Sequence, residues 1–199
     1  MGDAALKRVC VFCGSAVGAR PEYADAATAL ARELARRGLG LVYGGGSVGL
    51  MGVLADAALA AGVEVVGVIP RGLATRELAH PGLTEMRVVA SMHERKATMA
   101  ALSAGFVALP GGLGTLEETL EVLTWSQLGI HAKPVALLDV AGYYAGLRQM
   151  FAHAVREGFL RPEYAGLVLV ADTPAEALDR VAGWTPPRLA RAWLDEDET

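Results

Sequence analysis

Short apolar runs alternate with amphipathic helical patterns along the chain, and this alternation restricts the fold more than any other feature. The apolar runs, rich in strand-favouring valine, isoleucine and leucine, span residues 8–13, 39–43, 64–69, 86–90, 106–109, 135–138 and 167–170. Apolar residues recur at helical spacing in 21–37, 48–61, 93–103, 115–128, 143–157 and 174–181. Strands separated by single helices pair in parallel through right-handed crossovers. The sequence therefore predicts an α/β fold: a doubly wound parallel sheet of about seven strands with helices on both faces.

Composition limits the function classes. Of the 199 residues, 53% are hydrophobic and 20% charged, so the chain can bury a core and is not disordered. We expect one Rossmann-like domain at 1–183 and an acidic C-terminal extension at 184–199. The net charge of −4, with scattered basic residues, disfavours nucleic acid as a partner. No apolar run reaches the ~18 residues of a membrane span and no leader pattern opens the chain, so we expect a cytoplasmic protein without a membrane partner.

The two cysteines, Cys10 and Cys13, have the C-x-x-C spacing that redox and zinc proteins also use. Here the spacing falls within a predicted strand, where residues three apart point to opposite faces. No second cysteine pair completes a zinc site, and the histidines, at positions 80, 93, 131 and 153, are far apart in the sequence. We therefore expect two buried thiols, no metal and no cofactor.

Glycine-bearing loops follow three of the predicted strands. They are Gly14-Ser15, Gly44–Gly49 and Pro110–Thr115, and a predicted helix follows each. Ligands of doubly wound sheets bind at the carboxyl ends of the strands. Helix N-termini bind anions there, and glycine lets a phosphate approach the backbone. The three loops together predict a phosphorylated ligand.

The second loop also fits two other function classes. Gly44–Gly49 satisfies G-x-G-x-x-G, but no acid stands near the end of the next strand to hold a ribose, which disfavours NAD. The same segment satisfies G-x-S-x-G around Ser47, and Asp139 and His153 follow in the order of a serine hydrolase triad. His153 falls within a helical pattern, whereas triad histidines usually lie on loops. A hydrolase that uses Ser47 is therefore a weaker alternative.

The third loop carries a more specific motif, P-G-G-L-G-T-L-E-E at 110–118. Thr115 offers a hydroxyl to a phosphate, and Glu118 lies about one turn into the following helix, with Glu121 on the same face. The helix dipole can explain Glu117 as an ordinary acid of the first turn. The helix dipole explains the motif as a whole less well.

Arg95 and Lys96 lie near the predicted start of the helix that precedes this loop. The helix dipole disfavours cations there, so a purely surface role is disfavoured. A guanidinium fork suits a phosphate or carboxylate partner. The alternative, a solvated Arg-Lys pair, stays open.

Three linked segments resemble the Lonely Guy (LOG) family. They are Y-G-G-G-S-V-G-L-M-G at 43–52, M-x-x-R-K-A at 92–97 and P-G-G-x-G-T-x-x-E at 110–118, and T-W-x-Q-L-G at 124–129 is also similar. Members of this family are cytokinin riboside 5′-monophosphate phosphoribohydrolases. The resemblance implies hydrolysis of the N-glycosidic bond of N6-modified AMP, with AMP itself as a further candidate substrate, and release of free base and ribose 5-phosphate.

The resemblance also implies residue roles and an assembly. Arg95 and Glu118 are the implied catalytic pair, and a homodimer is the implied assembly. Leu113 replaces an aromatic residue that family members often carry. The expected substrate contacts, from the resemblance and from the loops together, are Gly14, Ser15, Gly45, Gly46, Glu77, Met92, Arg95, Lys96, Gly111, Gly112, Leu113, Gly114, Thr115, Glu118, Glu121 and Thr124.

Two further interpretations concern relatives of the family. Similar glycine-rich α/β proteins carry molybdenum cofactor, and a carrier would keep the loops without needing both Arg95 and Glu118, whose joint presence favours an enzyme. Relatives have also been labelled lysine decarboxylases, a chemistry that needs a Schiff-base lysine. The only lysines are Lys7 and Lys133, which precede strands, and Lys96 of the Arg-Lys motif, so we reject that label.

Overall fold

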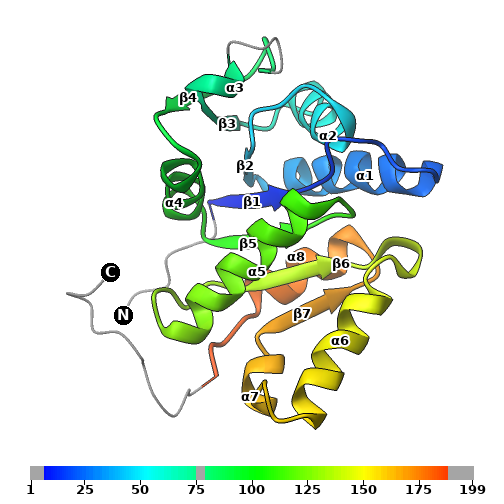
Figure 1. Cartoon of the computed structure of the whole chain (residues 1–199). Helices are drawn as coiled ribbons and strands as arrows, with labels where there is room; N and C mark the ends of the chain where they lie inside the picture. The colour runs from blue at the N-terminus through cyan, green and yellow to red at the C-terminus, as the bar shows by residue number, and fades with distance from the viewer. Residues whose placement is uncertain (1–6, 75–78, 188–199) are drawn as a thin grey trace.

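The computed structural model describes residues 7–74 and 79–187, and their strands form one parallel sheet of seven. The order across the sheet is β4-β3-β2-β1-β5-β6-β7 (Figure 1). The strands are β1 (Arg8–Phe12), β2 (Gly40–Tyr43), β3 (Val65–Pro70), β4 (Glu85–Val89), β5 (Gly105–Ala108), β6 (Val135–Leu138) and β7 (Val168–Ala171). The predicted doubly wound parallel sheet is confirmed.

Helices connect the strands in the predicted alternation. In the described part of the chain they are α1 (Pro21–Arg37), α2 (Gly49–Ala60), α3 (Arg71–Ala74), α4 (Met92–Leu102), α5 (Leu113–Leu128), the 3-10 turn η1 (Val140–Gly142), α6 (Ala145–Arg156), α7 (Pro162–Ala165) and α8 (Pro174–Ala182). The sequence pattern did not predict α3, η1 or α7, because segments of three or four residues are too short to show helical periodicity.

Helices cover both faces of the sheet, as predicted. Side chains of α1, α2 and α8 share one apolar core, and those of α4, α5 and α7 contribute to another. The chain segment around β1 shows the alternation, since Cys13 faces the first core and Cys10 the second. Burial raises the pKa of both thiols. The prediction of two buried cysteines on opposite faces is confirmed.

The strand order reverses between β1 and β5, and the three glycine loops lie at the carboxyl ends of β1, β2 and β5. The Gly14 N–H donates to the Pro110 carbonyl at 3.0 Å, which joins the loops after β1 and β5. The Leu50 N–H donates to the Gly14 carbonyl at 3.0 Å, which joins the loop after β2. The fold therefore gathers all three loops at the place where doubly wound sheets bind ligands.

Two helices, α5 and α6, begin two residues away from their predicted starts. α5 begins at Leu113, with Gly112 as its N-cap, rather than at Thr115. α6 begins at Ala145 rather than at Tyr143, because the 3-10 turn η1 follows β6 first. The earlier start of α5 places Glu117 beyond the first turn, so the interpretation of Glu117 as a first-turn acid is wrong.

The predicted C-terminal extension is only partly described. Its first residue, Trp184, packs against the core beneath α4 and α5, and its indole N–H donates to the Ala132 carbonyl at 3.2 Å. Residues 188–199 lie outside the described residues. Within 7–74 and 79–187, no helix is both long and apolar enough to cross a membrane. No cluster of His, Cys, Asp and Glu in these ranges could hold a metal ion.

Candidate active site

Arg95 and Glu118 form a buried ion pair at the carboxyl edge of the sheet. Arg95 Nη2 lies 3.2 Å from Glu118 Oε1, and the two side chains are 11% and 10% exposed. Arg95 comes from α4 and Glu118 from α5, so the pair spans the two helices beside β1. The structure therefore brings together the two residues expected to be catalytic.

Several groups fix the position of Arg95. Side chains cap the start of α4: the N-cap Ser91 Oγ accepts from the Glu94 N–H, and Glu94 Oε2 accepts from the N–H of Ala90, the residue before the N-cap. Arg95 Nε donates to the Val68 carbonyl at 3.1 Å, at the end of β3. A Cβ on Gly44 would lie 2.1 Å from Arg95 Nη2, so only glycine leaves room for the guanidinium.

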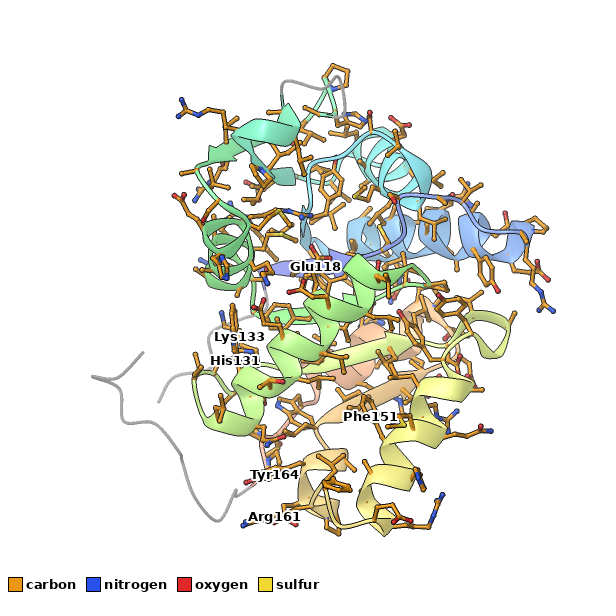
Figure 2. All side chains as sticks on the ribbon, viewed as in Figure 1. Glu118, His131, Lys133, Phe151, Arg161 and Tyr164 are labelled. Atoms are coloured by element: carbon orange, nitrogen blue, oxygen red, sulfur yellow. The ribbon has the colours of Figure 1, made fainter. Side chains whose placement is uncertain are left out.

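The surroundings of Glu118 raise the pKa of its carboxyl. Burial raises the pKa of this carboxyl, the Arg95 charge opposes the rise, and the net shift is upward. A carboxyl whose pKa lies above its usual range can exchange a proton more readily near neutral pH, as general acids and bases do. Figure 2 shows Glu118 on α5 well apart from His131 and Lys133, which follow the other end of this helix.

The loop between β5 and α5 provides an open backbone surface for an anion. A Cβ on Gly111 would lie 2.1 Å from Thr115 Oγ1, so the loop and the first turn of α5 are in close contact there. A Cβ on Gly112 or Gly114 would meet no heavy atom within 4 Å. The first N–H groups of a helix lack carbonyl partners within it, and this open helix start therefore suits a phosphate. Leu113, at the first position of α5, is 87% exposed.

A hollow of about 260 Å³ adjoins the loops after β1 and β5. Its lining comprises the loops Gly14–Gly18 and Pro110–Gly112 together with Tyr23, Leu50 and Tyr143. The expected contacts Gly14 and Ser15 thus lie next to the β5–α5 loop. The sequence pattern gave no signal for the two tyrosines, since their chain positions lie far from the glycine motifs.

Gly45 and Gly46 reach the same edge but have their carbonyls engaged within the protein. The Gly45 carbonyl accepts from the His80 N–H at 2.9 Å, and the Gly46 carbonyl accepts from the Tyr43 hydroxyl at 3.1 Å. Gly45 also has a left-handed φ of 75°, which glycine adopts without strain. These bonds hold the loop that gives Arg95 its space.

Lys96 and Glu121 face one another rather than the glycine loops. Lys96 Nζ lies 2.5 Å from Glu117 Oε1 and 2.8 Å from Glu121 Oε1, which links α4 to α5. Burial lowers the pKa of Lys96, but its bonds to the two carboxylates outweigh burial, and the net shift is upward. Glu117 is therefore a partner of Lys96. The Arg-Lys pair is not a solvated pair, because both side chains are nine-tenths covered.

The other expected contacts are less closely grouped. Met92 is half exposed at the start of α4, with its sulfur 3.9 Å from Arg95 Nη1. Thr124 donates to the Leu120 carbonyl and lines a separate groove between α5, α6 and α7. Phe151 and Tyr164 of this groove lie on α6 and α7, away from Glu118 (Figure 2). Glu77 lies outside the described residues.

The serine hydrolase alternative fails because the structure does not assemble its triad. Asp139 Oδ1 accepts from the Tyr144 N–H at 2.7 Å, and Oδ2 lies 3.4 Å from Arg148 Nη1. His153 is half exposed on α6, where Arg156 Nη2 lies 3.4 Å from its ring. Asp139 and His153 thus have separate partners, and neither lies in the loop of Ser47.

The chain resembles named proteins over most of its length. A family model described as "Possible lysine decarboxylase" matches residues 51–181. The "Probable cytokinin riboside 5'-monophosphate phosphoribohydrolase LOGL3" of Oryza sativa subsp. japonica is 50% identical over 184 residues, 92% of this chain and 87% of the relative. The "Cytokinin riboside 5'-monophosphate phosphoribohydrolase LOG1" of Arabidopsis thaliana is 48% identical, with 92% and 86% covered.

Solved structures share the fold at lower identity. The molybdenum cofactor binding protein of Rippkaea orientalis superimposes with a TM-score of 0.68 at 21% identity, over 89% of this chain and 96% of that one. The Moco carrier protein of Chlamydomonas reinhardtii gives a TM-score of 0.68 at 25% identity, with the same coverage. The identity to the LOG relatives is about twice as high. The chain therefore belongs to the Lonely Guy family, as its three linked motifs indicated.

Proposed function

We propose that this protein hydrolyses the N-glycosidic bond of N6-modified adenosine 5′-monophosphates and releases the free base and ribose 5-phosphate. The observation that carries the proposal is the buried Arg95–Glu118 pair at the sheet edge, because its Glu118 lies on the helix whose start has open space at Gly112 and Gly114. The names of the relatives at about 50% identity support this substrate class.

The geometry of α5 suits a ribose 5-phosphate. Glu118 follows Gly112 by six residues, or about 9 Å along the helix axis. Side chains on a helix tilt toward its N-terminus, so the Glu118 carboxyl leans toward the phosphate end. A phosphate at the helix start therefore directs the sugar toward the carboxyl.

The reaction requires a group that stabilises positive charge on the sugar. As the bond between C1′ and the base nitrogen breaks, its electron pair leaves with the base and the ribosyl group gains oxocarbenium character. The Glu118 carboxylate stabilises this charge and accepts a proton from the water whose oxygen bonds to C1′. The nitrogen that keeps the electron pair takes up a proton from solvent, and Glu118 later releases its proton to solvent, so that the net reaction consumes one water. Arg95 fixes the Glu118 carboxylate in place.

Product analysis tests the proposal. Purified protein is incubated with AMP and with isopentenyladenosine 5′-monophosphate, and chromatography detects free base and ribose 5-phosphate. We expect both products, and we expect Glu118→Gln to lose at least a thousandfold in turnover while it still binds AMP. Glu157→Gln, which removes an exposed carboxylate at the C-cap of α6, is the matched control and keeps full activity. Wild-type protein that releases no base from either nucleotide overturns the proposal.

A carrier of molybdenum cofactor is the second candidate, because the Chlamydomonas carrier shares the fold at 25% identity. An open glycine cradle serves a carrier as well as an enzyme. A carrier has no use for a buried carboxyl with a raised pKa beside an arginine. Tight nucleotide binding without base release, equal in wild type and Glu118→Gln, would favour the carrier.

We also propose that the protein forms a homodimer. Supporting this is a mostly apolar hollow of about 410 Å³ beside α4 and α5, lined by three alanines of α4 together with Trp125, Ile130, His131 and Lys133. A second copy would remove this apolar surface from water. Light scattering coupled to size exclusion should give twice the mass of the chain, and Ile130→Glu should halve it. A monomeric wild type would overturn the proposal.

A further inference from the structure

Two adjacent tyrosines hold the loop between β5 and α5 by its carbonyls. The Tyr143 hydroxyl donates to the Gly111 carbonyl, and the Tyr144 hydroxyl donates to the Leu109 carbonyl at 2.7 Å. Burial raises the pKa of Tyr144, so its hydroxyl stays a donor at neutral pH. The segment Leu109–Gly111, which leads into the open backbone at Gly112, is therefore held at two carbonyls by side chains from outside β5 and α5.

The turn that presents the tyrosines is strained and firmly held. Ala141 has φ 53°, the left-handed conformation that alanine rarely adopts, and Gly142 follows with φ 73°. Asp139, itself 7% exposed, accepts from the Tyr144 N–H at 2.7 Å and closes the turn. Strained backbone persists only where its surroundings hold it, and such positions cluster at functional sites.

The Tyr143 ring is fixed on two sides. It makes edge contacts with Tyr23, at 5.8 Å between ring centroids, and with Tyr144, at 5.1 Å. The side chain is still 40% exposed and lines the hollow beside the loops after β1 and β5. A ring so open to solvent contributes little to the core. The role of Tyr143 therefore lies in its hydroxyl, which donates to the Gly111 carbonyl.

The direction of the Gly112 N–H follows from peptide geometry. In a trans peptide the C=O and the following N–H point in opposite directions. The Gly111 carbonyl and the Gly112 N–H belong to one peptide plane, so fixing the carbonyl toward Tyr143 turns the N–H the other way. Gly112 is the N-cap of α5, and the space over it is open.

We propose that Tyr143 is a positioning residue, whose hydroxyl orients the Gly111–Gly112 peptide so that the Gly112 N–H donates to the phosphate of the substrate. Tyr144 and the strained Ala141 turn hold Tyr143 in place. The inference rests on the proposed function for the identity of the substrate, but its physical content is the affinity of this loop for a phosphate group.

Tyr143→Phe tests the inference because it deletes the hydroxyl and keeps the ring contacts. Isothermal titration with ribose 5-phosphate and with AMP should show affinity about fivefold to tenfold lower than in wild type, the loss expected for one hydrogen bond. In turnover the same factor should appear in KM, with kcat within about twofold, because phosphate binding is uniform along the reaction. Inhibition by adenine, which lacks a phosphate, should not change.

Tyr164→Phe is the matched control. It also deletes one tyrosine hydroxyl, but that hydroxyl is buried without a hydrogen-bond partner among the described residues and lies in the groove of α7. Its ligand affinities should equal those of wild type. Unchanged ribose 5-phosphate affinity in Tyr143→Phe would overturn the inference, as would an equal weakening of adenine. Wild type that binds AMP but releases no base would overturn the proposed function alone, since the affinity difference between wild type and Tyr143→Phe remains measurable.

Discussion

Arg95 and Lys96 are neighbours on α4, and both pair with carboxylates of α5, but their surroundings differ. Arg95 points to the carboxyl edge of the sheet, where Glu118 is its only acidic partner within ion-pair distance in the described chain, at 3.2 Å. Lys96 lies between two carboxylates, Glu117 at 2.5 Å and Glu121 at 2.8 Å. Glu117 is 54% exposed, whereas Glu118 is 10% exposed.

The difference indicates a catalytic role for the Arg95–Glu118 pair and a stabilising role for the ion pairs of Lys96. The single arginine does not offset the burial of Glu118, whose pKa is raised. Two carboxylates more than offset the burial of Lys96, whose pKa is also raised, so its charged form is stabilised. A group held against its charged state is prepared for proton transfer, whereas a satisfied ammonium holds two helices together. The first pair should control turnover and the second should control stability.

Among substitutions at Arg95, Lys96 and Glu117, Arg95→Gln should have the largest effect. We expect kcat/KM to fall roughly a thousandfold, since Glu118 loses the group that fixes it. The Arg95 charge lowers the pKa of Glu118 against the effect of burial. Without it the pKa rises further, the carboxylate forms only at higher pH, and the acid limb of the residual pH–rate profile moves upward. Rates measured between about pH 4 and 9 test this.

Arg95→Lys is the control for charge. It keeps a cation near Glu118 but cannot reach the Val68 carbonyl and the carboxylate with one planar fork. We expect a smaller shift of the acid limb with a rate still well below wild type. An acid limb at the wild-type pH in Arg95→Gln would mean that Glu118 does not control it.

Lys96→Met should act mainly on stability. Removing the ammonium leaves Glu117 and Glu121 side by side without a cation, and the buried Glu121 Oε2 already lacks a partner among the described residues. We expect a loss of about 1–2 kcal/mol, or roughly 3–6 °C in Tm, with kcat within about threefold.

A second substitution sharpens this test. Glu121→Gln added to Lys96→Met should recover part of the lost Tm, because it removes one of the two unpaired carboxylates. The LOG resemblance implies instead that Lys96 contacts substrate. A rise in KM of more than tenfold at wild-type Tm would support substrate contact by Lys96 and contradict a role confined to joining α4 and α5.

The sequence predicted the sheet because the strands are short apolar runs, each ended by glycine, by proline or by the start of a helical pattern. It could not predict the turn at Ala141, since a left-handed alanine has no local signal and depends on Asp139 and the packed tyrosines. It also placed the start of α5 at Thr115, because glycines at 111, 112 and 114 mask a helix that begins at Leu113.

Arg95 and Glu118 were predictable as a pair only through the family motifs. Their meeting depends on the crossover that brings α4 beside α5, and on the space at Gly44, neither of which local spacing encodes. The partners of Lys96 were missed for a related reason. A basic residue beside a phosphate motif is easily assigned to the ligand, whereas the carboxylates that bind it lie 21 and 25 residues away.

Glu117→Gln should have the smallest effect, although Glu117 is the neighbour of Glu118 in the sequence. Its carboxylate is half exposed, and exposed ion pairs contribute at most about 1 kcal/mol. Lys96 keeps Glu121 as a partner, so we expect a change in Tm of under about 2 °C and unchanged kcat. Thermal unfolding and steady-state rates at low and high salt measure both, and salt should remove what small difference there is. Glu118 is the next residue along α5, yet its substitution should abolish turnover. A tenfold loss of turnover in Glu117→Gln would show that the two neighbouring carboxylates share one function.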